Sequence, residues 1–306
     1  MAQPPETSIS SAFPFALHHV PILDSQMAYI DTGTPAGSLT PTTTVFLHGN
    51  PTSSFIWRNI IPHVSPRTRC VAPDLIGMGY SSKPAIDYRF TDHYRYLSSF
   101  LDAVVPAPTK LVLVCQDWGS ALAFHWATNH QERLVGLAFM EFIRPFSSWD
   151  DVGTGDIAGT FKAFRTPEIG RKMIIEENIF VKHILPGGVV RGLTAVENEF
   201  YERPFLEEGS REPVWRWPNE IPIEGSPADV WEFAEKYHKW LLETEIPKLL
   251  FWAEPGAFLK EATAQWYLKN LKNVKGVFLG NGVHYLQEDH PERIGKEVAA
   301  FIDGLN

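Results

Sequence analysis

An aspartate at the tip of an expected strand-to-helix turn is the residue of this chain best suited to covalent chemistry. The apolar run 111–115 leads to Asp117, and Trp118 opens an amphipathic helical pattern. This order is typical of a nucleophile elbow, a strained turn that projects one side chain above the carboxyl edge of a parallel sheet. A carboxylate there can attack an sp3 carbon and leave an ester that water then cleaves. The alternative is that Asp117 only caps the helix running to His130.

Hydrolysis of an ester on Asp117 requires a base that activates water, and His284 is the candidate. It follows the predicted strand 275–279 through the glycine-containing segment 280–283, just before the last helix. That position puts His284 at the carboxyl edge of the sheet, where Asp117 is also expected. In folds that carry such an elbow, the nucleophile, the acid and the histidine follow one another in that order along the chain, and His284 fits the last place.

Two further residues supply donors for the negative charges that develop. The turn 48–51 closes an apolar strand and can direct the backbone N–H and side-chain amide of Asn50 toward Asp117. The backbone N–H groups of Asn50 and Trp118 would hold an oxyanion during ester hydrolysis. The Asn50 amide and the Trp118 indole N–H then suit a weakly hydrated leaving anion such as chloride, bromide or iodide. Taken singly, Trp118 also fits core packing and Asn50 a turn.

The elements that must position these residues alternate between strands and helices. Most strand-like runs are continuously apolar, which favours a parallel sheet buried on both faces. Helical patterns fill the gaps, and the clearest one begins at Ser226 with capping residues. The sequence therefore predicts an α/β fold. The strands are expected at 27–31, 43–48, 69–73, 110–115, 134–141, 248–253 and 275–279, and helices at 92–105, 118–130 and 292–302.

The alternation stops for about eighty residues between Glu141 and Ser226, far more than an ordinary connection requires. We expect an inserted helical cap at 146–218, with the hydrolase core formed by 1–145 and 219–306. A cap over the sheet edge would enclose a mostly apolar cavity above Asp117. Four or five of the aromatic residues between Glu141 and Ser226 are expected to face that cavity, from the set Phe142, Phe146, Trp149, Phe161, Phe164, Phe180, Phe200, Tyr201, Phe205, Trp215 and Trp217.

Bulk properties exclude several classes of protein. The 306 residues are 44% hydrophobic and 13% aromatic, which is enough for a large core. A net charge of -9 without a basic run argues against nucleic acid and anionic membranes. The opening residues 1–8 do not resemble a signal peptide, and Cys70 and Cys115 lie in apolar runs, so we expect a cytoplasmic protein. The pairs His18-His19 and Asp289-His290 lack ligand-like spacing, so no metal is expected.

Five motifs together resemble the haloalkane dehalogenase family of α/β-hydrolases, and the likeness extends over nearly the whole chain. They are His48-Gly49-Asn50-Pro51-Thr52-Ser53-Ser54, Ala72-Pro73-Asp74-Leu75-Ile76-Gly77-Met78-Gly79, Gln116-Asp117-Trp118-Gly119-Ser120, Met140-Glu141-Phe142-Ile143-Arg144-Pro145 and His284-Tyr285-Leu286-Gln287-Glu288-Asp289. The cap matches too, at Phe164-Arg165-Thr166 and Tyr201-Glu202-Arg203-Pro204-Phe205.

The resemblance implies a role for each site residue. Asp117 would be the nucleophile, His284 the base and Glu141 the acid that orients it, while Asn50 and Trp118 would bind halide. Such enzymes convert a small apolar haloalkane and water into an alcohol and a halide ion, without a cofactor.

Departures from the family pattern leave more than one reading of the chain open. After Trp149, the segment Val152-Gly153-Thr154-Gly155-Asp156 replaces the usual second Trp and the Pro. This acidic segment is expected to be flexible, which leaves the shape of the tunnel open. Glu254, after the strand 248–253, competes with Glu141 as the acid, although Glu141 lies within the matching motif. An epoxide hydrolase would use a cap tyrosine as proton donor, with Tyr201 the nearest candidate. A cofactor-independent marine luciferase uses a similar scaffold, and a non-enzymatic receptor of this fold would keep the cavity and lose turnover.

Overall fold

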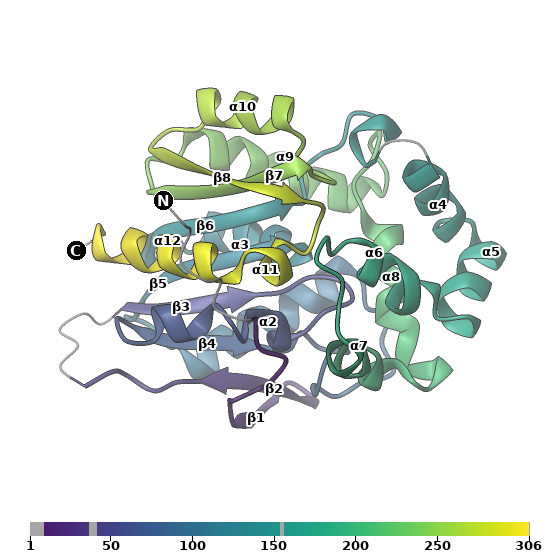
Figure 1. Cartoon of the computed structure of the whole chain (residues 1–306), viewed down its shortest axis with the longest axis horizontal. Coiled ribbons are helices and arrows are strands. Elements are labelled where there is room, and N and C mark those ends of the chain that lie inside the picture. Colours follow the sequence, from purple (N-terminus) through teal and green to yellow (C-terminus); the bar gives the residue numbers. More distant parts are fainter. Residues whose placement is uncertain (1–8, 37–41, 154–155, 306) are drawn as a thin grey trace, which may run out of the picture.

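The computed structural model describes residues 9–36, 42–153 and 156–305. Its centre is an eight-stranded sheet with the order β1-β2-β4-β3-β5-β6-β7-β8 (Figure 1). β1 and β2 pair antiparallel, β2 pairs antiparallel with β4, and every other neighbouring pair is parallel. The strands are β1 (Leu17–Ile22), β2 (Ser25–Asp31), β3 (Thr42–Leu47), β4 (Arg69–Pro73), β5 (Lys110–Asp117), β6 (Leu134–Phe142), β7 (Lys248–Pro255) and β8 (Val274–Gly282).

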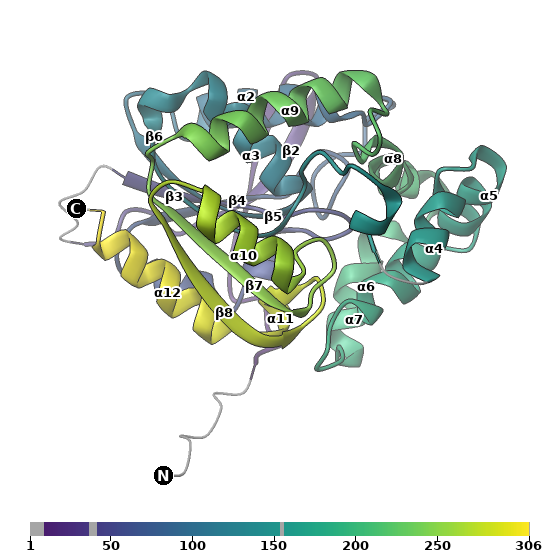
Figure 2. The ribbon, with the colours of Figure 1, turned by 90° about the horizontal axis from the view of Figure 1, so that it is seen from above.

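Helices cover both faces of the sheet, which explains why most of its inner strands carry a continuous apolar run. Along β5, Leu111 and Leu113 pack with α2, α3 and α9, whereas Val112 and Val114 pack with α1 and α12. Figure 2 shows α2, α3 and α9 on one side of the sheet and α12 on the other. The α/β prediction is therefore confirmed. These helices are α1 (Ile61–Val64), α2 (Phe90–Val104), α3 (Trp118–Asn129), α9 (Ala228–Glu243) and α12 (Pro291–Asp303), while α10 (Glu261–Asn270) contacts β7 and β8 and α11 (Leu286–Asp289) follows β8.

Two predictions about individual elements were wrong. β1 was missed because two histidines and a proline interrupt the apolar residues of its sequence, Leu-His-His-Val-Pro-Ile. The strand is only partly buried, as suits the edge of a sheet. The helix expected from Ser226 begins at Ala228 instead. Pro227 stands at its N-cap position, and no side chain makes a capping hydrogen bond there.

A helical insertion follows β6 and lies beyond one end of the sheet (Figure 1). Its α-helices are α4 (Asp156–Phe164), α5 (Pro167–Arg171), α6 (Leu185–Gly187), α7 (Ala195–Glu202) and α8 (Glu212–Glu220), joined by other short helical segments. This is the expected cap, although the division at 146 and 218 stays a prediction. In the segment expected to be flexible, residues 154–155 lie outside the described residues, and Val152 is buried.

A buried ionic network fastens the cap to the core. Arg58 of the core donates to Glu197 of α7 at 2.6 Å and to both carboxylate oxygens of Glu288 in α11, at 2.6 and 2.9 Å. Arg191 of the cap bonds to the same two carboxylates. The Tyr201 hydroxyl also donates to Glu288. Because the carboxylates are buried, each depends on these cations for the hydrogen bonds that water would otherwise supply.

Other features bear on the predicted location of the protein in the cell. Within the described ranges, no helix is both long and apolar enough to span a membrane. Cys70 and Cys115 are buried and free, so they do not pair with each other. The opening residues 1–8, whose composition bears on a signal peptide, lie outside the described part of the chain.

Candidate active site

Asp117 occupies a strained turn between β5 and α3. Its φ of 53° and ψ of -131° are unusual for a residue with a side chain. The turn needs glycine on both sides: a Cβ on Gly49 would lie 2.1 Å from Asp117 Oδ1, and one on Gly119 would lie 2.2 Å from the Leu47 carbonyl oxygen. The Asp117 side chain makes no capping bond to α3. The geometry is that of the expected elbow, and the helix-cap alternative is wrong.

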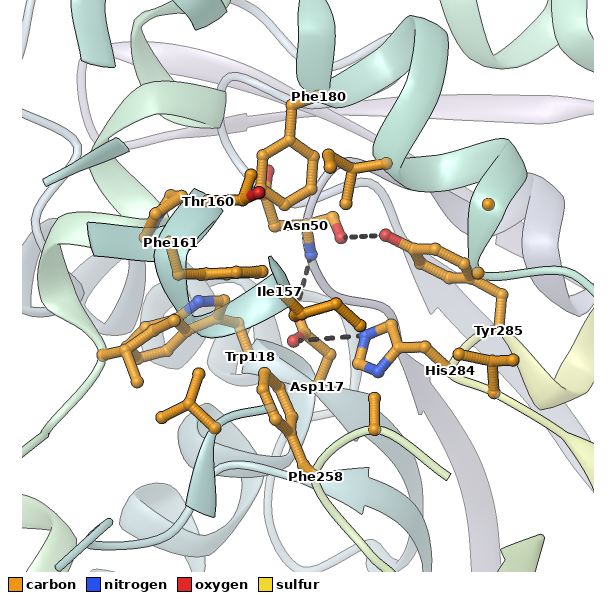
Figure 3. A pocket seen from close by; sticks show the side chains of 18 of the residues that line it. Asn50, Asp117, Trp118, Ile157, Thr160, Phe161, Phe180, Phe258, His284 and Tyr285 are labelled. Carbon is orange, nitrogen blue, oxygen red and sulfur yellow. Dashed lines mark hydrogen bonds and ion pairs between the residues drawn. The ribbon is translucent and has the colours of Figure 1, made fainter. Parts of the chain in front are cut away.

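The Asp117 carboxylate contacts one donor and the predicted base. Oδ1 accepts a hydrogen bond from the backbone N–H of Asn50 at 2.8 Å. Oδ2 lies 3.5 Å from Nε2 of His284. Figure 3 shows Asp117 between Trp118 on one side and His284 on the other. The residues predicted from two distant loops therefore meet at the elbow.

Glu141 lies behind the imidazole ring. Its Oε2 is 3.1 Å from His284 Nδ1. The carboxylate also accepts three backbone N–H groups, from Ala257 at 3.2 Å, Phe258 at 2.8 Å and Leu259 at 3.2 Å. These bonds fix its position and stabilise its charge, although the side chain is fully buried. Glu254, the competing candidate, is exposed and its carboxyl group interacts with Glu261.

The two carboxylates control the charge of His284. Burial by itself would lower the pKa of the imidazole, because it penalises the charged form. Hydrogen bonds and charge from Asp117 and Glu141 outweigh this effect and raise the pKa to about 9. Both carboxylates therefore favour the imidazolium form of His284. If either carboxylate is neutralised, the pKa of His284 must fall.

The Trp118 indole is held by a stack of aromatic rings. Its ring lies 4.3 Å from that of Trp217 in the cap, which in turn stacks at 4.1 Å on His93. The Asn50 side-chain nitrogen donates to the Val214 carbonyl at 3.3 Å, which leaves its second hydrogen for another acceptor. Asn50 and Trp118 both line the cavity above Asp117. The stack was not expected from the sequence, where Trp217 was only one of the cap aromatics.

The cavity encloses about 210 Å³ and is mostly apolar. Its wall combines core and cap residues: Asn50, Asp117, Trp118, Val152, Ile157, Thr160, Phe161, Phe180, His183, Ile184, Gly187, Gly188, Pro218, Ile221, Ala257, Phe258, Val283, His284 and Tyr285. Exposed Ile157 and His183 mark where it reaches the surface. Of the cap aromatics, Phe161 and Phe180 line it, so the expectation of four or five was too high. Among the described residues, no cluster of three or more His, Cys, Asp or Glu could hold a metal ion.

Comparison with known proteins shows the family of the chain. Residues 43–164 match the model of the alpha/beta hydrolase fold. A haloalkane dehalogenase of Mesorhizobium japonicum is 51% identical over 92% of this chain and 90% of its own length. A second, from Bradyrhizobium diazoefficiens, is 46% identical over 97% of both. The crystal structure of haloalkane dehalogenase DbeA from Bradyrhizobium elkani covers 95% of this chain and 98% of its own, with 47% identity and a TM-score of 0.91.

The chain belongs to the haloalkane dehalogenase family. In this member of the family, further residues hold His284 and the Asn50 loop together. The Tyr285 hydroxyl donates to the Asn50 carbonyl at 3.0 Å (Figure 3). The Gly188 carbonyl of the cap accepts the backbone N–H groups of His284 at 3.2 Å and Tyr285 at 3.1 Å. Tyr285 adjoins the predicted base in sequence and could have been suspected, whereas nothing in the sequence pointed to Gly188.

Proposed function

We propose that this dehalogenase acts through an alkyl ester on Asp117. The contact between Asp117 and His284, at 3.5 Å beside an apolar cavity, is the observation that supports this most strongly. The substrate we propose is a small apolar haloalkane, with water as co-substrate and halide as product. No contact with nucleic acid or membrane is needed. We also propose a cytoplasmic location, which the free cysteines support.

In the first step, a carboxylate oxygen of Asp117 attacks the carbon that bears the halogen. The new C–O bond forms as the carbon–halogen bond breaks, and the halogen leaves with the bonding electron pair. The side-chain amide of Asn50 and the indole N–H of Trp118 then receive the halide. The surrounding apolar wall strengthens both interactions, because water does not compete for the donors.

In the second step, ester formation itself prepares the base. Alkylation removes the charge of Asp117, so the pKa of His284 falls and the ring loses its proton more readily. Neutral His284 Nε2 takes a proton from water as the water oxygen attacks Cγ of the ester. The backbone N–H of Asn50 stabilises the resulting oxyanion, with that of Trp118 as the expected second donor. The intermediate then expels the alcohol, which takes the proton from His284. The carboxylic acid left on Asp117 loses its proton to solvent, and this regenerates the carboxylate as the halide is released.

Halide release from a panel of terminal chloro-, bromo- and iodoalkanes tests the proposal. The wild-type protein should release one halide and one alcohol per substrate consumed. Asp117→Ala should remain folded by circular dichroism but release no halide, because the carboxylate forms the bond to carbon. Near-normal turnover by a folded Asp117→Ala variant would exclude this nucleophile.

Epoxide hydrolysis and luciferase-like oxygenation find less support than dehalogenation. An epoxide hydrolase needs a tyrosine hydroxyl directed at the bound substrate, but the Tyr201 hydroxyl is engaged with buried Glu288. Tyr285 does line the cavity, yet its hydroxyl donates to the Asn50 carbonyl. A luciferase-like oxygenation would reveal itself by light emission with an imidazopyrazinone. We expect none above background.

A further inference from the structure

The side-chain amide of Gln116 contacts the ring nitrogen that must take the proton from water. Gln116 precedes Asp117 on β5, and its side chain is fully buried. Its amide nitrogen lies 2.9 Å from His284 Nε2 and 3.4 Å from the His284 carbonyl oxygen. The amide oxygen has no hydrogen-bond partner among the described residues. None of the roles derived so far accounts for this side chain.

The two contacts determine which way the amide faces. A carbonyl oxygen only accepts hydrogen bonds, so the group beside the His284 carbonyl must be the NH₂. Its second hydrogen then points at His284 Nε2, which accepts it through its lone pair. A neutral ring with a lone pair on Nε2 carries its hydrogen on Nδ1, and Nδ1 faces Glu141. This is the tautomer that ester hydrolysis requires.

We propose that Gln116 is a positioning residue that favours the neutral, proton-accepting form of His284 and so sets the pH at which the ester is hydrolysed. The inference rests on the proposed ester mechanism. In the free enzyme, Asp117 and Glu141 both favour the imidazolium. In the ester, Asp117 is neutral, and the balance lies between the Glu141 charge and the Gln116 N–H.

The other groups packed against the ring do not change this balance. Tyr285 is titratable and lies 4.7 Å from the imidazole, but burial raises its pKa well above the ordinary value, so it stays neutral. Phe258, at 5.2 Å, carries no charge. The cap contributes the Gly188 carbonyl, which binds the backbone N–H of His284 and not the ring. Asp117 and Glu141 are therefore the charges that oppose Gln116.

Gln116 and the hydrolytic water donate to the same lone pair, so one must replace the other. The hydrogen bond from the Gln116 nitrogen to the His284 carbonyl allows this exchange. It keeps the amide in place when Nε2 accepts a hydrogen bond from water and no longer from Gln116. Gln116 thus acts as a substitute donor. It favours the neutral ring until water arrives, and it is not itself a proton carrier, since an amide does not titrate in this range.

The test compares Gln116→Met with the wild-type protein in single-turnover reactions with a bromoalkane. Formation and decay of the alkyl-enzyme are followed by rapid quenching and mass spectrometry from about pH 5 to about pH 10. The rate of ester decay should rise with pH as His284 loses its proton, and this rise is the pH limb of ester decay. Loss of one hydrogen bond to the neutral ring should move the midpoint of the limb upward by about half to one pH unit. Decay below the limb should then be about three- to tenfold slower, and decay above the limb unchanged.

Two further variants distinguish this effect from a packing defect. Gln116→Glu places a carboxylate at the same ring nitrogen and should move the limb further upward than Gln116→Met does. Gln287→Met is the matched control: Gln287 is also buried, and its amide has no hydrogen-bond partner among the described residues. The control should leave the limb where it is.

Three outcomes would overturn the inference. They are a limb that does not move in Gln116→Met, a limb that moves to lower pH, and slowing of ester formation and decay by the same factor at every pH. In each of these cases the ester still forms, and the proposed function stands. If no variant and no wild-type sample forms an ester on Asp117, the proposed function itself has failed.

Discussion

Replacing Glu197 by glutamine should destabilise the protein by about 3 kcal/mol at neutral pH. Glu197 lies at the centre of the network that joins the cap to the core. Its carboxylate accepts hydrogen bonds from Arg58, from Arg191 and from the backbone N–H of Thr194 at 2.8 Å. Glutamine keeps the shape of the side chain and removes its charge, so buried Arg58 and partly buried Arg191 each lose one of their anions.

The magnitude follows from the pKa of the carboxyl group. Burial alone would raise the pKa of Glu197, but the hydrogen bonds and charges of Arg191, Thr194 and Arg58 lower it from 4.5 to about 2. A shift of that size corresponds to about 3 kcal/mol, at about 1.4 kcal/mol per unit. Because the pKa is lowered on folding, this stability is complete above the unfolded value. It is lost as the pH falls toward the folded value.

Urea unfolding of the wild type and of Glu197→Gln at several pH values measures this difference. The difference in unfolding free energy should be about 3 kcal/mol at pH 7 and about 1 kcal/mol near pH 3. Glu199→Gln is the matched control, since Glu199 is on the same helix but is 70% exposed, with an ion pair to Arg203. The control should lose no more than about 0.5 kcal/mol.

Equal losses in Glu197→Gln and Glu199→Gln would refute the reasoning, because burial of the network would then add nothing. A loss in Glu197→Gln that did not change with pH would also refute it. In that case the effect would come from altered packing and not from the charge of the carboxylate.

Further variants test other parts of the site. Glu141→Gln should slow ester hydrolysis by about a hundredfold or more, whereas Glu254→Gln should change it little. A larger loss in Glu254→Gln than in Glu141→Gln would identify Glu254 as the acid. In Gly188→Ala the new Cβ would lie 2.8 Å from the Tyr285 ring, so kcat/KM should fall about tenfold. Gly159→Ala is the control, because a Cβ there would meet no atom within 4 Å. Trp118→Phe should weaken the fluorescence response to bromide, and an unchanged response would remove Trp118 from the halide site.

Much of the fold could be predicted because the inner strands carry a simple signal. A strand covered by helices on both faces is largely apolar, and β5, β6 and β7 show this pattern over 111–115, 134–140 and 249–253. β1 has no such pattern, because an edge strand satisfies its polar side chains with solvent. Its place in the sheet is decided by pairing with β2, which is a tertiary contact.

The proposed reactive groups were also identifiable, since Asp117, His284 and Glu141 each follow or end a strand at the same edge of the sheet. What the sequence could not reveal depends on how segments pack together. The donation from Gln116 to the imidazole is set by a side-chain torsion and by the depth of burial. The stack of Trp217 on Trp118 requires the cap to be docked on the core.

The most direct test of the central claim is the fate of the covalent intermediate in His284→Phe. Without a base for water, Asp117 should still attack the substrate, release one halide per active site and then stop. Intact mass spectrometry should find the protein plus the substrate without its halogen, and the modified peptide should contain Asp117 and Trp118. Turnover of many equivalents by His284→Phe, with no adduct on that peptide, would contradict the account.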